Sequence, residues 1–401
     1  MKTATQHFLL VLLAGTALIL PAQAQEIPPA VAAMLDNFER QTGLKPTYSS
    51  LETDSSGNVS IAALTMSVSA SGTDPAVKLV IDAVELSDIE DQGDGLYEIG
   101  STSFSGLKMD IGDAEFSATL SVPESSAEGW YVKALGDSPT PEDSLRAAMN
   151  VARKMSSGKM TITAMGQTIT IDGYEQTWDG DPATGAGKFA MKLSNVAIPE
   201  STIAMLDTMG MMKQLGYNGV NFDLTSNGNL DITGGNMGLS FDFAFAGRDM
   251  GQLSFGASAS GIPIAVYAEL QKAQSGGSEP DFNALMPQIQ TITLNHVNLR
   301  FDDASLVNRV LPMVAAMQGM EQAAMVANAG AMVQLGLMQF QNQAFTDQTV
   351  AAVNSFLKEP KSLTVSAKPT SPVTVMELMG LNPANPGEAI TKLGVTVSAN
   401  D

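Results

Sequence analysis

The chain has few residues that could act as a nucleophile or a general base. Its 401 residues include no cysteine and two histidines, of which His7 lies in an apolar N-terminal segment. A Cys–His pair is therefore excluded, and a Ser-His-Asp triad would have to use His296, whose apolar neighbours are typical of a structural imidazole in a strand. The sequence has no P-loop, no zincin motif and no nucleophile elbow in a fitting context. We expect no catalytic residue and no cofactor.

Acidic residues leave two further kinds of chemistry open. Two-carboxylate hydrolysis needs only a pair of acids in one cleft, so it stays as an alternative. The segment Asp88–Asp94 has oxygen ligands and a turn glycine, but it lacks the alternate spacing and the terminal glutamate of a twelve-residue calcium loop. Asp179 and Asp181 resemble it in this respect. We expect solvated acidic hairpin turns at both places and no metal site.

Methionine is the unusual residue type, with 24 copies in a chain of only 6% aromatic content. Thioethers bind Cu(I), but the helical spacing of these methionines also matches ordinary core packing. Methionine-rich surfaces adapt to irregular apolar ligands, which suggests a groove for an acyl chain or an amphipathic peptide. The candidate groove residues are Met209, Met212, Val310, Val314, Met317, Met325, Met332 and Met338.

The first 24 residues predict a cleavable secretory signal. Lys2 is followed by an apolar run from Phe8 to Leu20, and small residues at Ala22 and Ala24 mark a cleavage site before Gln25. Because the chain has no cysteine, it has neither a lipid-anchoring signal cysteine nor a disulfide framework. An exported chain of this kind must be stabilised by its core, and 44% hydrophobic content allows a large one.

The charge balance excludes several partners. Removal of the signal takes away one basic residue of 21 and none of the 42 acidic residues, which leaves a net charge of −22. Phosphate backbones and anionic lipid surfaces repel such a chain. We expect no nucleic-acid partner, and lipid or envelope protein remains as the candidate partner class.

The elements predict a β-rich α+β fold with long antiparallel meanders and interspersed amphipathic, methionine-rich helices. Alternating apolar and polar residues mark many strands, most clearly over residues 218–270, where Asn227-Gly228, Gly234-Gly235 and Gly247–Gly251 are typical of hairpins. We divide the chain into the signal at 1–24, a β-rich region at 25–273 and a region at 281–401. The first region has helices near 140–157 and 200–215, and the second has a strand, a helical segment at 303–358 and closing strands.

The helical segment contains an uncharged stretch, Gln322–Thr346. A membrane span is one interpretation, but recurring Asn and Gln and the lack of flanking Lys or Arg argue against it. We expect buried or groove-lining helices and no stable span after signal cleavage. Strand 193–198 followed by a capped helix parallels strand 294–299 followed by another, which indicates either two related strand–helix modules or convergence.

Two segments carry a resemblance. Residues 299–307, LRFDDASLV, and 356–364, FLKEPKSLT, resemble uncharacterised exported proteins of alphaproteobacterial type over the last quarter of the chain. In overall design, with long repetitive strands behind an export signal, the chain also resembles the AsmA-like group of bacterial envelope proteins. AsmA-like proteins usually keep an N-terminal membrane anchor, which a cleavable signal would remove. The resemblance implies an envelope location and no functional residues.

These patterns together predict an exported, periplasmic, non-catalytic binding or scaffold protein that holds an apolar ligand or an envelope partner. The alternatives are a surface-exposed, adhesin-like β-rich protein in the external medium or at the cell surface, and a carboxylate-dependent hydrolase. The sequence pattern leaves the oligomeric state open.

Signal cleavage predicts a defined mature terminus. In fractionated cells that express the full sequence, mass spectrometry of the periplasmic protein should identify Gln25 as its first residue. Intact chain that keeps Met1–Ala24 in the inner membrane would contradict cleavage.

Overall fold

The computed structural model describes residues 27–68, 76–113, 116–149, 151–267, 269, 282–382 and 385–401. These residues form two compact units: the first comprises the described residues up to Ile198 together with Tyr267 and Glu269, and the second comprises Pro199–Val266 and the described residues from 282 onward. The division after Ile198 falls inside the region 25–273. The signal at 1–24 and most of the segment between 267 and 281 lie outside the described residues. The predicted β-rich α+β class is confirmed.

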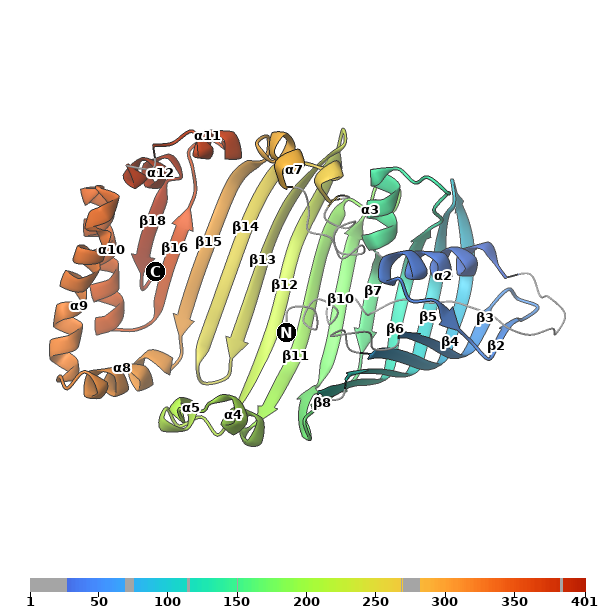
Figure 1. The fold of residues 1–401 in the computed structure, drawn as a ribbon, viewed down its shortest axis with the longest axis horizontal. Helices are drawn as coiled ribbons and strands as arrows, with labels where there is room; N and C mark the ends of the chain where they lie inside the picture. The colour runs from blue at the N-terminus through green and yellow to red at the C-terminus, as the bar shows by residue number, and fades with distance from the viewer. Residues whose placement is uncertain are drawn as a thin grey trace. The chain divides into compact units, whose positions relative to one another are not determined.

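The first unit is a sheet of long strands with two helices (Figure 1). In chain order its elements are α2 (Pro29–Thr42), β1 (Pro46–Thr47), β2 (Ser50–Thr53), β3 (Val59–Val68), β4 (Ala76–Gly93), β5 (Leu96–Gly112), β6 (Ser117–Lys133), α3 (Pro141–Met149), β7 (Ala152–Ser157), β8 (Met160–Ala164), β9 (Gln167–Ile171), β10 (Gly173–Gly180) and β11 (Gly187–Pro199).

Its strands pair antiparallel in a meander that branches once. β1 and β2 lie end to end along β3, and β3, β4, β5 and β6 follow in order. β6 then pairs with β7 and β8, which lie end to end, and these lead through β10 and β9 to β11. The predicted acidic hairpin turn is the β4–β5 connection, where the Asp91 carboxylate accepts from the Gly93 N–H at 2.8 Å.

Helix α2 covers the apolar side of this sheet and is absent from the elements that the sequence patterns predicted. Val31, Met34, Leu35 and Phe38 recur at helical spacing and are all buried, and the helix contacts β5 and β6. Phe38 packs on the indole ring of Trp130 with ring centroids 6.3 Å apart. The helix begins with a proline in its first turn and ends at a left-handed glycine, which are ordinary start and stop signals.

The helix predicted near 140–157 is wrong in its second half. α3 ends at Met149, and residues 152–157 form strand β7. Ala152 lies opposite Trp130 of β6, and Lys154 lies opposite Glu128 on one side and Thr177 on the other. Strands β6 and β10 on either side of β7 therefore supply hydrogen-bond partners for its backbone N–H and C=O groups. These hydrogen bonds outweigh the helix propensity of the local sequence.

The second unit combines a meander with a helical insertion. Its elements are α4 (Glu200–Leu206), α5 (Met211–Gln214), β12 (Gly219–Thr233), β13 (Asn236–Gly247), β14 (Gly251–Pro263), α7 (Phe282–Ile289), β15 (Thr293–Asp303), α8 (Leu306–Met317), α9 (Gln322–Leu337), the 3₁₀ turn η1 (Met338–Phe340), α10 (Gln343–Lys358), β16 (Ser362–Ala367), β17 (Val373–Thr374), α11 (Val375–Met379), α12 (Pro386–Lys392) and β18 (Val395–Ala399).

Strands β12, β13, β14, β15, β16 and β18 pair antiparallel in that order, and β17 extends the line of β16 along β15. The hairpin turns predicted at Gly234-Gly235 and Gly247–Gly251 are confirmed. The turn predicted at Asn227-Gly228 is wrong, because both residues lie inside β12 and pair with Asp242 and Phe241 of β13. Between β15 and β16 the chain leaves the sheet for α8, α9 and α10, which confirms the helical segment 303–358. The Asp303 carboxylate accepts from the Val307 N–H at 2.9 Å and so caps the start of α8.

The single helix predicted near 200–215 is wrong, because two short helices occupy this segment. α4 stops at Leu206, and both carboxylate oxygens of Asp207 accept from the N–H groups of Met211 and Met212, at 2.8 and 2.6 Å. Gly210 has a φ of 68°, which a helix interior does not allow. Asp207 thus ends one helix and caps the next.

Helix α9 also differs from expectation. Its uncharged sequence suggested a buried or groove-lining helix, yet Gly330 is its one buried residue. It packs on α10 along one side, and most of its circumference faces solvent.

The α2 contact predicts a measurable loss of stability. Leu35 is 1% exposed, so Leu35→Ala should lower the free energy of unfolding by about 3 kcal/mol through lost burial and a cavity. Urea unfolding followed by tryptophan fluorescence measures this, since both tryptophans, Trp130 and Trp178, belong to the first unit. Ala32→Ser on the exposed side of the helix is the control and should change little. A loss below about 1 kcal/mol for Leu35→Ala would contradict a core role for α2.

Candidate functional site

The sheet of the second unit has one apolar and one polar face. Side chains alternate along each strand, and directly paired residues share a face. In β13 the aromatic residues Phe241, Phe243 and Phe245 alternate with Asp242 and small residues. The apolar sheet face comprises Leu224, Phe241, Phe243, Phe245, Leu253, Phe255, Val297, Leu299, Phe301, Leu363, Val365, Val395 and Val397.

The centre of this face is a row of directly paired residues that crosses four strands. Phe243 pairs with Phe255, Phe255 with Leu299, and Leu299 with Val365. Their exposed fractions are 37%, 37%, 44% and 39%, and Leu253 beside the row is 46% exposed. Exposed apolar residues that are scattered singly are normal, but a contiguous row of them indicates a binding surface.

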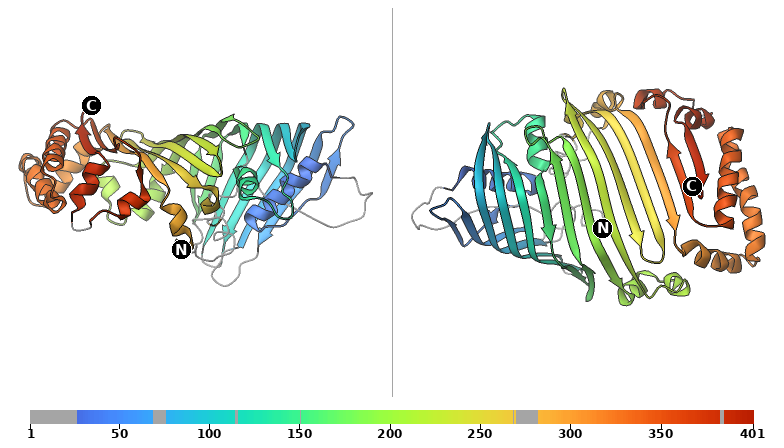
Figure 2. Two further views of the ribbon diagram at one scale, coloured as in Figure 1. Left: turned by 90° about the horizontal axis from the view of Figure 1, so that it is seen from above. Right: turned by 180° about the vertical axis from the view of Figure 1, so that it is seen from behind.

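Helix α10 covers this face only at its β16–β18 end. Phe356 of α10 is buried and meets Phe301 edge to face with centroids 6.3 Å apart. Val397 of β18, which continues the row beyond Val365, is 5% exposed under this cover. In Figures 1 and 2, α7 lies near one end of the middle strands and α8 near the other, and neither crosses their centre. The strands β13, β14 and β15 therefore present apolar side chains to solvent.

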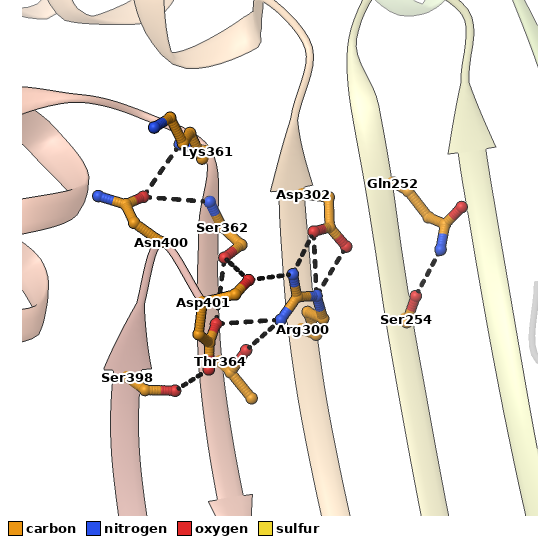
Figure 3. A network of polar contacts seen from close by, with 10 residues as sticks. All are labelled: Gln252, Ser254, Arg300, Asp302, Lys361, Ser362, Thr364, Ser398, Asn400 and Asp401. Carbon is orange, nitrogen blue, oxygen red and sulfur yellow. Dashed lines mark hydrogen bonds and ion pairs between the residues drawn. The ribbon is translucent and has the colours of Figure 1, made fainter.

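The opposite face carries a polar network around Arg300 (Figure 3). The guanidinium donates to both carboxylate oxygens of Asp302 at 2.7–3.0 Å and to Asp401 and Thr364 at 3.1–3.2 Å. Ser398 donates to the Asp401 carboxylate at 2.7 Å. The network joins strands β15, β16 and β18 to Asp401.

Electrostatics identify this network as structural. Hydrogen bonds that Arg300 donates to Asp302 raise the pKa of Arg300, and the Ser398 hydroxyl, ahead of Ser362 and Arg300, lowers the pKa of Asp401. Each guanidinium nitrogen of Arg300 donates to an oxygen of this chain, so the group is already engaged within the fold. The polar face is therefore a weaker candidate for ligand binding than the apolar face.

The candidate groove residues lie in four parts of the second unit and differ in exposure. Met209, Met317, Met332 and Met338 are 66–71% exposed, and the other four are half-buried. They lie on the α4–α5 segment (Met209, Met212), on α8 (Val310, Val314, Met317), on α9 (Met325, Met332) and in η1 (Met338). Helix α9 contacts both α8 and η1, and Arg309 of α8 donates to the Leu215 carbonyl just after α5 at 3.0 Å.

A solvent-open hollow of about 490 Å³ lies elsewhere in the unit, between the start of α10, α12 and β18. Phe345, Ile390 and Val395 contribute to its lining. Asn342 in its wall caps α10 through the Phe345 N–H and donates to Thr391, so its polar atoms serve the fold. Over the described ranges, no group of three or more His, Asp and Glu residues is placed to hold a metal ion.

The sequence contained a signal for the apolar face that methionine spacing did not reveal. Strands were predicted over residues 218–270 and at 294–299, and the alternation within them already assigned the aromatic side chains to one side. The sequence did not show which part of the apolar face is covered by a helix. Sequence periodicity shows that a face is apolar but not whether a helix lies on it.

A family model described as an uncharacterized protein matches residues 244–400. No curated protein matches the chain. The resemblance of the C-terminal quarter to an uncharacterised family is thus confirmed over a longer range. The matched residues include β14, β15, β16 and α10, and so contain most of the apolar sheet face and its partial cover.

The Asp401 network predicts a pH dependence. Because its folded pKa lies below the ordinary 3.8, Asp401 contributes stability above that pH, and the contribution is lost as pH falls through the lowered value. Asp401→Asn should cost at most about 1 kcal/mol at pH 6, and the difference from the original chain should shrink as the pH falls below 3.8. Urea unfolding at a series of pH values measures both. Asp137→Asn, at an exposed loop position, is the control, and an Asp401→Asn cost that stays constant with pH would contradict the assignment.

Proposed function

We propose that this chain is an exported, non-catalytic binding protein that holds an uncharged apolar molecule, such as the acyl chain of a lipid, against its apolar sheet face. The observation that carries the proposal is the exposed row Phe243, Phe255, Leu299 and Val365 on contiguous strands. A row across four strands is roughly 15 Å long at the usual strand spacing, which suits an extended hydrocarbon chain.

Burial supplies the affinity. Full burial of a Phe or Leu side chain is worth about 1.5–3 kcal/mol, so covering five side chains that are 37–46% exposed yields roughly 4 kcal/mol. Each ligand methylene that leaves water adds about 0.8 kcal/mol, and association costs offset part of the sum. We expect dissociation constants in the micromolar range for a medium-length chain.

The charge distribution selects the ligand class. The mature chain carries a net charge of −22, so anionic ligands are repelled at long range. On this face, the positions from Phe241 to Phe245 and those paired with them on β12, β14 and β15 carry no charged side chain. Neutral or zwitterionic lipids fit both conditions.

The acids offer no support for the hydrolase alternative. A two-carboxylate hydrolase needs one carboxyl group with a raised pKa to act as the general acid. In the described part of the chain, the carboxyl groups with a shifted pKa are Asp54, Asp110, Glu359, Glu377 and Asp401, and all of them are shifted downward. Hydrogen bonds and neighbouring lysines favour their ionised forms.

The predicted signal and the overall likeness to AsmA-like envelope proteins support a periplasmic location. An apolar surface of this kind would let an exported protein hold an envelope lipid away from water. The alphaproteobacterial resemblance is compatible with such an envelope.

Ligand binding tests the proposal through the central row. The double variant Phe255→Ser/Leu299→Ser removes two exposed side chains and should weaken binding of a pyrene-labelled monoacylglycerol at least about tenfold. Fluorescence titration gives the dissociation constants, and native mass spectrometry of the unmodified chain should detect co-purified neutral or zwitterionic lipid.

Met165→Ser is the matched control, because Met165 is 61% exposed but lies in the first unit. It should bind as tightly as the unmodified chain. Equal affinity of the double variant, or a lack of saturable binding by the unmodified chain, would exclude the sheet face as the site.

A further inference from the structure

Helix α9 is an apolar surface separate from the sheet face. No charged residue lies between Glu321 and Asp347. By length and composition, Gln322–Phe340 is the one described helix that could cross a membrane, and only 6% of its most apolar window is buried. Such helices in soluble proteins are normally covered, so its exposure requires an explanation.

The exposed side is rich in long flexible side chains. Met332, Leu335 and Met338 are 67%, 72% and 66% exposed, and their spacing at i, i+3 and i+6 places them on one side of the helix. Met317 and Met320, just before α9, are 71% and 37% exposed. Exposed alanines at 323, 327 and 331 extend the apolar surface around the helix.

The inner side of α9 is fixed by close packing. Gly330 faces Asn354 of α10, and a Cβ at Gly330 would lie 2.7 Å from the Asn354 side-chain amide nitrogen. The absence of a side chain at Gly330 therefore lets the two helices approach closely. This packing fixes the orientation of α9, so that its opposite side faces solvent.

The attachment of both ends rules out a spanning position. Four residues connect α8 to α9, and two connect η1 to α10. A helix of 19 residues is about 28 Å long, close to the thickness of the hydrocarbon core, so a span would place its two ends on opposite sides of the bilayer. Both α8 and α10 belong to one folded unit, which cannot lie on both sides.

The surface chemistry selects a lipid surface over a protein partner. A partner helix would cover a narrow stripe of α9, whereas its exposed apolar residues extend over about half of its circumference, together with the exposed, uncharged Asn328 and Gln334. A bilayer interface covers a broad, uncharged surface without requiring a complementary shape. Because the chain carries a net negative charge, it is not attracted to anionic lipid. The uncharged surface of α9 does not depend on electrostatic attraction to insert into a bilayer.

We propose that α9 docks in the plane of a zwitterionic phospholipid bilayer, with Met332, Leu335 and Met338 inserted among the acyl chains. This inference does not rest on the proposed ligand at the sheet face.

Fluorescence tests the docking directly, since the cysteine-free chain accepts one introduced thiol. The exported chain with Leu335→Cys, labelled with an NBD fluorophore, should show a blue-shifted emission and a several-fold rise in intensity with phosphatidylcholine vesicles. The change should persist in 0.5 M NaCl, because no charge pairing is involved. The same label at Met165→Cys should not respond.

Vesicle flotation of matched variants assigns the surface. Met332→Gln/Leu335→Gln/Met338→Gln should lower partitioning to phosphatidylcholine vesicles at least tenfold. Met205→Gln/Met209→Gln/Met211→Gln changes three other exposed methionines of the same unit and should keep it. Circular dichroism verifies that both variants are folded. Phe255→Ser/Leu299→Ser should also keep vesicle binding, which separates this inference from the sheet-face function.

Three outcomes overturn the docking proposal. The first is a label at position 335 that does not respond to vesicles, and the second is loss of partitioning in the control triple variant but not in the α9 variant. The third is a response that depends on protein concentration without lipid, together with a dimer in light scattering that the α9 variant abolishes, because a second copy would then cover α9.

Discussion

An antiparallel sheet places every second side chain on the same face, and an apolar face in water must be covered. The first unit meets this constraint with α2, whose Leu35 and Phe38 are buried beside β5 and β6. The second unit meets it only at one end, where Phe356 of α10 packs on Phe301. The exposed centre of that face is the part of the fold that packing within the chain leaves incomplete.

The opposite face explains how such a sheet stays folded without a full cover. Arg300, Asp302 and Asp401 bind one another across β15, β16 and the residues after β18, and the hydroxyl groups of Thr364 and Ser398 complete the network. Each partner has solvent on one side, so no buried charge has to be compensated. Hydrogen bonds on the polar face hold the strands in register while the apolar face remains free.

Sequence patterns predicted where helices and strands occur better than they predicted what packs against each of them. The β-rich class, the hairpin glycines and the helical segment 303–358 follow from alternation, turn residues and caps, which are local properties. Residues 152–157 became a strand because β6 and β10 flank them, and such a nonlocal effect is invisible in one sequence. The break at Asp207 was visible as a capping residue followed by Gly210, but the apolar stripe of the segment concealed it.

The candidate site also depends on nonlocal packing that the sequence does not reveal. Methionine spacing suggested a shared groove, yet the candidate residues are spread over the α4–α5 segment, α8, α9 and η1, and four of the eight are 66–71% exposed. The uncharged sequence of α9 is equally compatible with a buried helix and an exposed one. Tertiary packing decides between them, and Gly330 fixes one side against Asn354 and leaves the other side open.

The two exposed surfaces differ in the stiffness of their side chains, and this difference is consistent with the different partners proposed for them. Phenylalanine and valine on the sheet have few rotamers, and paired strands fix their positions, so they present a defined shape to one molecule. Met332 and Met338 on α9 have three rotatable bonds each and conform to whatever lies against them. A rigid row suits a bound chain of definite width, and a flexible stripe suits the fluid interior of a bilayer. A protein with both could take an acyl chain from a membrane on which it is already docked, since the two surfaces belong to the same folded unit.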